Sequence, residues 1–345
     1  MKIYEERRLK LTENLSGDIA VIIPGSVLAN RSNDTAYPFR QDSNFYYLSG
    51  FNEPDSTLMI INKSGKTNSI GFVPKKDKLK EIWDGFRHGP EGMKSDFGFN
   101  DAFNNDEIDE LLPDLLDGVS CVYYPFGKVE GFDQKVIKWT KKANSKDRHS
   151  KKIEIADISK IIGNKRLIKD SSEINIIEKA CKISANAHLE AMKFVKPDMN
   201  EAEVEAFYLY EFAKNGGRFP AYNPIVASGE NACVLHYVEN NQVINDGDLL
   251  LVDAGCEYEM YASDITRTFP ANGKFSDEQL QIYNIVLEAQ KASVDAVSKG
   301  NGVMDPQTIS EKVITEGLID LGIIKGNLEE EHEKGSFKDF YMHKI

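Results

Sequence analysis

The sequence predicts two domains: an N-terminal α/β domain with a mixed sheet, and a C-terminal α+β domain. Its 345 residues are enough for about two ordinary domains. Strand-like and helix-like runs alternate in the first half, whereas the second half carries a β-rich segment, 224–270, between helices. Residues 144–152 (NSKDRHSKK) are polar and charged, as in an exposed connection, so we place the domains at 1–160 and 161–345.

The first domain is expected to hold strands and helices in alternation. Each strand-like run is short, rich in β-branched or aromatic residues, and bounded by turn residues. Elements that alternate in this way form an α/β unit around a mixed sheet. The predicted strands are 18–24, 57–62, 69–73 and 120–124, and the predicted helices are 106–118 and 131–143.

The helices of the second domain carry start signals. Asn200 and Glu203 form a capping-box pattern, and Ser276 and Gln279 repeat it. The predicted helices are 171–192, a helix that stops at Gly216-Gly217, a helix from 277 to about 299, and 306–321. For the first of these, the apolar stripe predicts a buried face made of Ile174, Ile177, Cys181, Ala185, Leu189 and Met192.

A long hairpin is predicted between these helices. Residues 247–253 (GDLLLVD) form an apolar strand entered by a turn, and residues 261–268 (YASDITRT) alternate polar and apolar side chains. The intervening 255–259 (GCEYE) turns the chain.

Charge and composition exclude several classes of function. The formal charges sum to 0 over residues 1–165, so the whole net charge of −13 falls on residues 166–345. Nucleic acid is disfavoured because its phosphates would be repelled. No run approaches the roughly 18 apolar residues of a membrane span. The charged N-terminus lacks the apolar core of a signal peptide, so a cytoplasmic location is expected. The four cysteines, without a C-x-x-C pair, are predicted to be reduced core thiols.

Two aspartates in the hairpin suggest a metal site. Asp253 ends a very hydrophobic strand, where a carboxylate is costly unless it is paired or binds a metal. Asp264 lies on the returning strand, and two close carboxylates need a counter-charge. A divalent cation supplies that charge, and oxygen ligands suit Mn²⁺. The alternative is that Asp253 caps a turn while Asp264 pairs with Arg267, and spacing alone favours this alternative.

Several motifs change that balance. They are VDAG (252–255) before YASDITRTF (261–269), GRFPAYN (217–223), IVASGEN (225–231), LHYVEN (235–240), and, in the first half, YPFRQDSNFY (37–46) and LSGFNEP (48–54). In order and spacing they resemble the Xaa-Pro aminopeptidase (aminopeptidase P) family of pita-bread metallopeptidases. The resemblance covers essentially the whole chain and both domains.

The resemblance implies a pita-bread C-terminal domain and a metalloaminopeptidase. Such an enzyme releases the N-terminal residue from peptides with proline second, by attack of a hydroxide that bridges two metal ions. Asp253 would bind one ion and Asp264 would bridge both, with Mn²⁺ as the expected metal. A homodimer or homotetramer is expected, and no nucleic acid or membrane partner.

Three further residues are expected to contact the substrate by the same resemblance. His236, in LHY, resembles a histidine that hydrogen-bonds the substrate and stabilises the tetrahedral intermediate. His343, in YMH, resembles a second substrate-contacting histidine. Trp83, in EIW, resembles an aromatic residue that lines the substrate cleft, and simple packing within the N-terminal domain is an equal alternative.

The sequence also departs from the family. There, a stretch like YMH leads into a histidine ligand, and two glutamate ligands follow, whereas this sequence stops at Lys344-Ile345. We therefore expect a truncated chain with an incomplete pita-bread domain, weak metal binding and little or no activity. A prolidase-like dipeptidase and a non-catalytic pita-bread binding module remain as alternatives.

Overall fold

The structure is a computed structural model that describes residues 2–146 and 152–342. It divides into two compact units, Met1–Ile174 and Asn175–Ile345. This division lies inside helix α8 (Ser171–Phe194), a short way past residue 160, where the sequence places the end of the first domain. That domain boundary therefore stays a prediction. Within the described part of the chain, every helix is too short or too polar to cross a bilayer.

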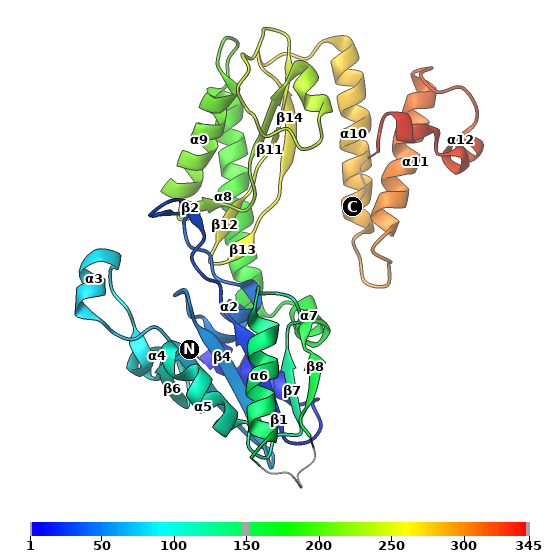
Figure 1. Cartoon of the computed structure of the whole chain (residues 1–345). Helices are drawn as coiled ribbons and strands as arrows, with labels where there is room; N and C mark the ends of the chain where they lie inside the picture. The colour runs from blue at the N-terminus through cyan, green and yellow to red at the C-terminus, as the bar shows by residue number, and fades with distance from the viewer. Residues whose placement is uncertain (1, 147–151, 343–345) are drawn as a thin grey trace. The chain divides into compact units, whose positions relative to one another are not determined.

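Unit 1 is built on a six-stranded mixed sheet with the order β6-β5-β4-β1-β7-β8 (Figure 1). The central strand β1 pairs antiparallel with β4 and parallel with β7. All four predicted strands are present, and β6 and β8 extend the sheet at its edges. The bounds are β1 Ile19–Pro24, β4 Thr57–Lys63, β5 Lys66–Val73, β6 Asp101–Asn104, β7 Cys121–Tyr124 and β8 Glu154–Asp157, with a separate two-stranded ribbon of β2 Asn30–Ser32 and β3 Thr35–Ala36.

Helices cover both faces of this sheet, so unit 1 has two hydrophobic cores. Strand β1 is buried along its whole length, and its alternating side chains divide between the cores because successive residues of a strand face opposite ways. Ile19 and Val21 join a core with Phe45 and Ile162, whereas Ile22 joins a core with Trp139. The helices are α1 Lys2–Thr12, α2 Ser43–Ser49, α3 Lys78–Asp84, α4 Gly89–Phe97, α5 Ile108–Leu115, α6 Phe132–Asn144 and α7 Ser159–Leu167, with a 3-10 turn η1, Asn105–Glu107, before α5.

The helices of unit 2 begin where the capping boxes predict. Both boxes are formed, at Asn200 before α9 and at Ser276 before α10. Helix α10 ends at Ala296, earlier than predicted, because the Asn301 side chain donates to the Ala296 carbonyl at 2.8 Å and closes the last turn. The bounds are α9 Glu201–Lys214, α10 Asp277–Ala296, α11 Asp305–Asp320 and α12 Leu328–Lys334, with 3-10 turns η2 Gly229–Cys233 and η3 Ser336–Asp339.

The predicted hairpin forms the centre of unit 2, with two corrections. The returning strand predicted at 261–268 is broken after Ala262 and resumes at Thr266, and the predicted turn at 255–259 contains a short strand of its own. Strand β11 (Leu249–Asp253) pairs antiparallel with β10 (Ile225–Ser228) and β14 (Thr266–Pro270), and Asp253 lies opposite Thr266. Between β11 and β14 a smaller hairpin of β12 (Cys256–Tyr258) and β13 (Tyr261–Ala262) forms, and β12 also pairs with β9 (Phe219–Pro220). Its two-residue loop has positive φ at both positions, which suits a tight two-residue turn.

The buried face predicted for α8 is wrong. Residues Ile174, Leu189 and Met192 of the predicted stripe are exposed, as is Cys181. The face that packs on the sheet of unit 2 is made of Ala180, Ile183, Ser184, Ala187, His188 and Ala191. The predicted face and the observed face both have helical spacing. The observed face is the buried one because its small side chains allow α8 to pack closely on the sheet, and Ser184 and His188 are buried among them.

The cysteines are free, as predicted, but only one of them is a core residue. Cys256 is buried and Cys121 is half-buried, whereas Cys181 and Cys233 are exposed.

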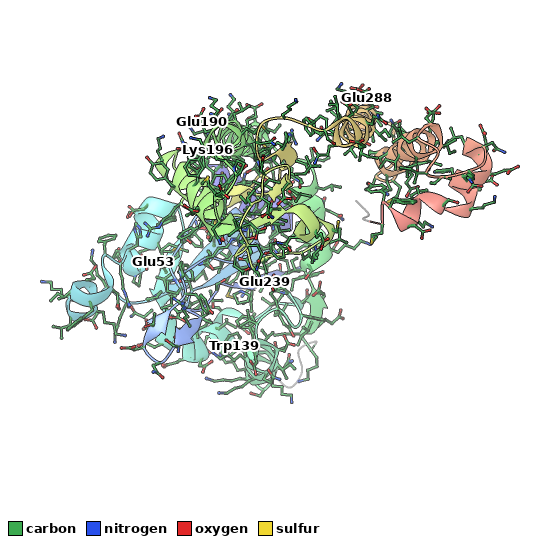
Figure 2. All side chains as sticks on the ribbon, turned by 90° about the horizontal axis from the view of Figure 1, so that it is seen from above. Glu53, Trp139, Glu190, Lys196, Glu239 and Glu288 are labelled. Atoms are coloured by element: carbon green, nitrogen blue, oxygen red, sulfur yellow. The ribbon has the colours of Figure 1, made fainter. Side chains whose placement is uncertain are left out.

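Much of the acidity of the second half lies on exposed surface. Figure 2 labels Glu190 and Glu288, which pair with Lys193 and Lys291 one helical turn further on, at 2.7 and 2.8 Å. Ion pairs of this kind contribute little to stability, so these carboxylates act mainly as a solvated surface.

Candidate metal centre

Asp253 and Asp264 converge on one hydroxyl group. Asp253 is the last residue of β11 and is half-buried, whereas Asp264 is exposed and lies between β13 and β14. The hydroxyl of Tyr222 donates to Asp253 Oδ1 at 2.5 Å and lies 3.0 Å from Asp264 Oδ1. The hairpin therefore places both carboxylates around a single point.

The hydroxyl of Tyr222 stays protonated in this position. Burial raises the pKa of Tyr222 far above its usual range, and the hydrogen bond and negative charge of Asp253 raise it further. The proton of Tyr222 therefore lies between two acidic groups that would otherwise repel each other.

The alternative pairing of Asp264 with Arg267 does not occur. Arg267 Nη1 donates to the carbonyl oxygen of Thr266 at 2.8 Å. In residues 2–146 and 152–342, neither Asp253 nor Asp264 forms an ion pair with a basic side chain. Two adjacent carboxylates without a basic partner are suited to a divalent cation, and their oxygens are ligands that Mn²⁺ accepts.

A glycine permits the close approach that brings the two aspartates together. A Cβ on Gly255 would lie 1.8 Å from the carbonyl oxygen of Ser263, far inside van der Waals contact. The backbone bonds from Ala254 N to Ile265 O, 3.1 Å, and from Ser263 N to Cys256 O, 3.0 Å, join the same two segments. The glycine of the VDAG motif is therefore required by packing directly beside Asp253.

A serine pair fixes the same segments to α8. Ser184 Oγ lies 2.7 Å from Ser263 Oγ, and the N–H of Cys256 donates to Ser184 Oγ at 2.9 Å. All three residues are buried. Since Ser263 precedes Asp264, these bonds help to set where the second carboxylate lies.

A buried histidine on the next turn of α8 holds the residue that follows Asp253. His188 Nε2 lies 3.2 Å from the carbonyl oxygen of Ala254, so Nε2 carries the proton and donates. Nδ1 then accepts from the Tyr208 hydroxyl at 2.8 Å. Burial lowers the pKa of His188, which keeps the ring neutral. Our sequence analysis missed Ser184, His188 and Tyr208; polar residues at helical spacing between alanines were the available signal.

The structure describes two of the three predicted substrate contacts. His236 is exposed on the segment after η2, and it makes no hydrogen bond to either aspartate in the part of the chain that the structure describes. Trp83 is 87% exposed on α3, a helix without a buried residue, so it does not pack into the core of unit 1. His343 lies outside the described residues.

The aspartate pair has no third strong ligand beside it in the described residues. No group of three or more histidine, cysteine, aspartate or glutamate side chains able to hold a metal occurs within 2–146 and 152–342. Among the described residues, the candidate site thus consists of the two carboxylates of Asp253 and Asp264 alone.

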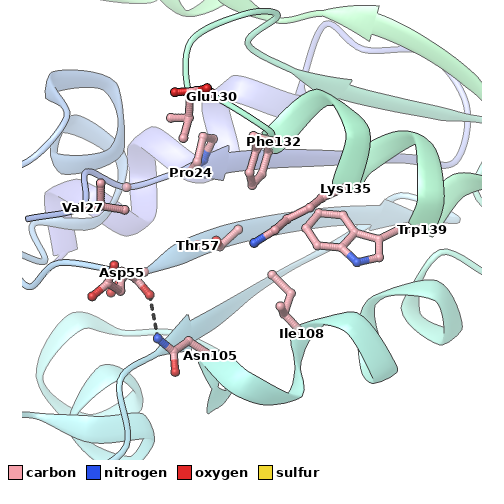
Figure 3. A pocket seen from close by; sticks show the side chains of 13 residues that line it. Pro24, Val27, Asp55, Thr57, Asn105, Ile108, Glu130, Phe132, Lys135 and Trp139 are labelled. Atoms are coloured by element: carbon pink, nitrogen blue, oxygen red, sulfur yellow. Dashed lines mark hydrogen bonds between the residues drawn. The ribbon is translucent and has the colours of Figure 1, made fainter.

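A separate cavity of about 350 Å³ lies within unit 1, beside the end of β1 (Figure 3). Lys135 of α6 points into it, and Asn105 donates to the Asp55 carbonyl at 3.0 Å on the opposite side. Trp139 forms part of its wall. Its lining contains none of the predicted site residues.

Comparison with known proteins identifies the class. Residues 175–345 match Metallopeptidase family M24, and residues 4–123 match the aminopeptidase P N-terminal domain. The chain is 39% identical over 340 residues to the Xaa-Pro aminopeptidase of Haemophilus influenzae, covering 99% of this chain and 77% of that protein. It is 37% identical over 343 residues to the Xaa-Pro aminopeptidase of Escherichia coli, covering 99% and 78%.

Solved structures agree. Aminopeptidase PepP of Pseudomonas aeruginosa superimposes with a TM-score of 0.95 at 40% identity, covering 99% of this chain and 77% of that one. Zinc-substituted E. coli aminopeptidase P in complex with product superimposes with a TM-score of 0.96 at 37% identity, covering 99% of this chain and 78% of that one.

Fold and comparisons together define a metallopeptidase, a hydrolase with an aminopeptidase P N-terminal domain and a pita-bread C-terminal domain. The chain belongs to the Xaa-Pro aminopeptidase family. The predicted fold class and enzyme class are therefore confirmed.

Proposed function

We propose that this protein releases the N-terminal residue from peptides whose second residue is proline. The observation that carries the proposal is the pair Asp253 and Asp264, which meet at the Tyr222 hydroxyl without a basic partner among the described residues. Membership of a family whose relatives are named Xaa-Pro aminopeptidases supports the substrate class.

The two carboxylates would hold divalent metal ions, with Mn²⁺ as our expected metal. The chemistry of the site fits, because both side chains offer oxygen ligands and share a position that needs positive charge. Bound divalent ions would acidify water and polarise the scissile carbonyl. Asp253 is fixed by the end of β11, and Asp264 by the serine pair with α8.

Other side chains would bind and orient the peptide. His236 would donate a hydrogen bond to the substrate carbonyl oxygen as negative charge develops there. His343 would make a second contact, and the exposed indole of Trp83 would line the substrate cleft. A proline nitrogen has no N–H to donate, so recognition of the second residue depends on shape and apolar contact.

By themselves, the side chains of Asp253 and Asp264 leave most of the coordination shell of each cation to other ligands. We also expect a homo-oligomer, which light scattering of the purified protein would test directly.

The function is tested with purified protein, Mn²⁺ and a Gly-Pro-Xaa tripeptide. We expect release of glycine that requires the metal and is lost in Asp264→Asn, whereas Asp246→Asn, an exposed aspartate of the same unit bonded to Asn272, keeps it. Cleavage that survives Asp264→Asn and a chelator would contradict the proposal.

Two other outcomes would replace it. Cleavage of the Gly-Pro dipeptide alone would indicate a prolidase. Peptide binding by calorimetry that is unchanged in Asp264→Asn, with no cleavage even after prolonged incubation with Mn²⁺, would indicate a binding module.

A further inference from the structure

Glu201, the first residue of α9, is a completely buried carboxylate with a relative exposure of 0%. Burial of a charge is costly unless hydrogen bonds or an opposite charge compensate it. None of the ion pairs in residues 2–146 and 152–342 involves Glu201. Its compensation therefore has to come from neutral donors.

These donors all come from one segment of chain, residues 228–242. Glu201 Oε1 accepts the Ser228 N–H at 2.8 Å, the Ser228 hydroxyl at 2.7 Å and the Asn231 amide at 3.1 Å. Oε2 accepts the Tyr237 hydroxyl at 2.7 Å and the Gln242 N–H at 3.0 Å. One carboxylate thus ties together the two ends and the middle of the segment.

The charged form of Glu201 is the stable one. Burial alone would raise its pKa, but the hydrogen bonds from Gln242, Ser228 and Tyr237 outweigh burial and hold the pKa below its usual value. Glu201 also stands at the N-terminus of a 14-residue helix, where the helix dipole favours negative charge.

A second buried side chain fixes the same segment to strand β10. Asn240 is buried with a positive φ of 45°, and its side chain accepts the Val226 N–H at 2.9 Å and donates to the Pro224 carbonyl at 2.9 Å. It also donates to Glu205 of α9 at 3.0 Å. Tyr237 is buried, while its neighbour His236 remains exposed.

We propose that Glu201 is a positioning residue: it holds the segment 228–242 in the conformation that presents His236 to the peptide. The inference rests on the proposed function for the role of His236. The holding of the segment itself is independent of that role, because it follows from the five hydrogen bonds alone.

The test compares two variants of the whole chain by hydrogen–deuterium exchange. Glu201→Gln keeps the size of the side chain but replaces one carboxylate oxygen with an NH₂ group. Both oxygens of Glu201 accept hydrogen bonds, so the NH₂ group faces hydrogen-bond donors in either orientation of the amide. Glu203→Gln is the matched control, since Glu203 lies in the same turn and accepts the Asn200 N–H at 2.7 Å. We expect amides of 229–242 to exchange about ten-fold faster in Glu201→Gln, and at the wild-type rate in Glu203→Gln.

Equal exchange of 229–242 in both variants, or an increase spread evenly over unit 2, would overturn the proposal. If Glu201→Gln does not fold, Tyr237→Phe removes a single donor and should raise exchange of the same amides by a smaller factor. Unchanged exchange in Tyr237→Phe would then overturn it. None of these measurements depends on peptidase activity, so they separate this inference from the proposed function.

A pH profile distinguishes an ionised anchor from simple packing. The folded-state pKa of Glu201 lies below the ordinary glutamate pKa of about 4.3. Protection of the segment against exchange, corrected for the intrinsic exchange rate, should therefore persist at neutral pH and be lost as the pH falls through the folded-state pKa. Other titratable groups lie near Glu201 or on the segment. Tyr237 donates to Glu201, Asn240 of the segment donates to Glu205, and Glu230, His236 and Glu239 of the segment are exposed. Because these groups remain in Glu201→Gln, that variant should lose only the acid-dependent loss of protection that Glu201 causes. An identical dependence of protection on pH in wild type and Glu201→Gln would overturn the proposal.

Discussion

Gly255 shows how a single residue determines the geometry of the candidate metal centre. The carbonyl of Ser263 occupies the space that any side chain at 255 would need. The sequence reveals the glycine as part of VDAG, but it does not reveal the contact, because that contact joins segments that only the folded hairpin brings together.

Gly255→Ala is therefore expected to lower the free energy of unfolding of unit 2 by about 3 kcal/mol or to prevent its folding, because the two segments must separate. Gly302→Ala is the control: Gly302 is exposed, has no positive φ and meets only the Asp305 side chain, at 3.6 Å or more. Urea unfolding measures both, and equal stability of the two variants would contradict the packing argument.

At the scale of elements, sequence patterns predicted where the helices begin better than which of their faces is buried. The capping boxes at Asn200 and Ser276 gave the starts of α9 and α10, because they act through local backbone groups. The buried face of α8 could not be found this way. Most of the apolar side chains of the predicted stripe are exposed, whereas Ile183, small residues and the hydrogen-bonded Ser184 and His188 are buried.

The corrected face of α8 predicts a clear contrast between two alanine variants. Ile183 is 3% exposed, so Ile183→Ala should cost about 3 kcal/mol of unfolding free energy through lost burial and a cavity. Leu189 lies on the face first predicted to be buried and is 56% exposed, so Leu189→Ala should cost less than about 1 kcal/mol. Thermal or urea unfolding that ranks the two in reverse would restore the original assignment.

The start of α8 is linked to α1 by an ion pair that should make unit 1 sensitive to acid. Arg7 Nη2 lies 2.9 Å from Asp170 Oδ2. Burial alone would raise the pKa of Asp170, but hydrogen bonds from Ser172 and Glu173 and the charge of Arg7 hold it well below its usual range.

A depressed folded-state pKa stabilises the protein above the unfolded pKa of about 3.9, and that stabilisation is lost as pH falls through the folded value. Asp170→Asn should therefore lower stability at pH 7 and flatten the fall in stability below about pH 4. Unfolding curves of unit 1 across pH 7 to pH 2 measure this, with the exposed Asp117→Asn as control. A parallel pH dependence in wild type and Asp170→Asn would rule out this linkage.

For the whole molecule, the sequence was most informative where motifs in both halves agreed. The two-domain organisation, the hairpin and the two aspartates followed from strand patterning together with the family resemblance. The sharing of the Tyr222 hydroxyl did not, because the phenol lies far from both aspartates in sequence and its geometry depends on the folded sheet. The network behind them, from Ser184 to Tyr208, was missed for the same reason.

Trp83 is the predicted substrate contact that belongs to unit 1, and its exposure separates its two interpretations. Trp83→Ala should leave the free energy of unfolding within about 0.5 kcal/mol of wild type, since almost none of the indole is buried in the chain. It should raise KM for the tripeptide while kcat changes less. A large loss of stability with an unchanged KM would instead support a packing role.

The distribution of the cysteine thiols has a practical consequence. Cys233 closes η2 within the segment held by Glu201 and is open to solvent, while Cys256, beside the aspartate hairpin, is shielded. A maleimide fluorophore should therefore attach at Cys233 in the native protein, with Cys181 as the competing exposed site, which Cys181→Ser would remove. Such a label would report peptide docking by a change in emission, without any engineered attachment point near His236.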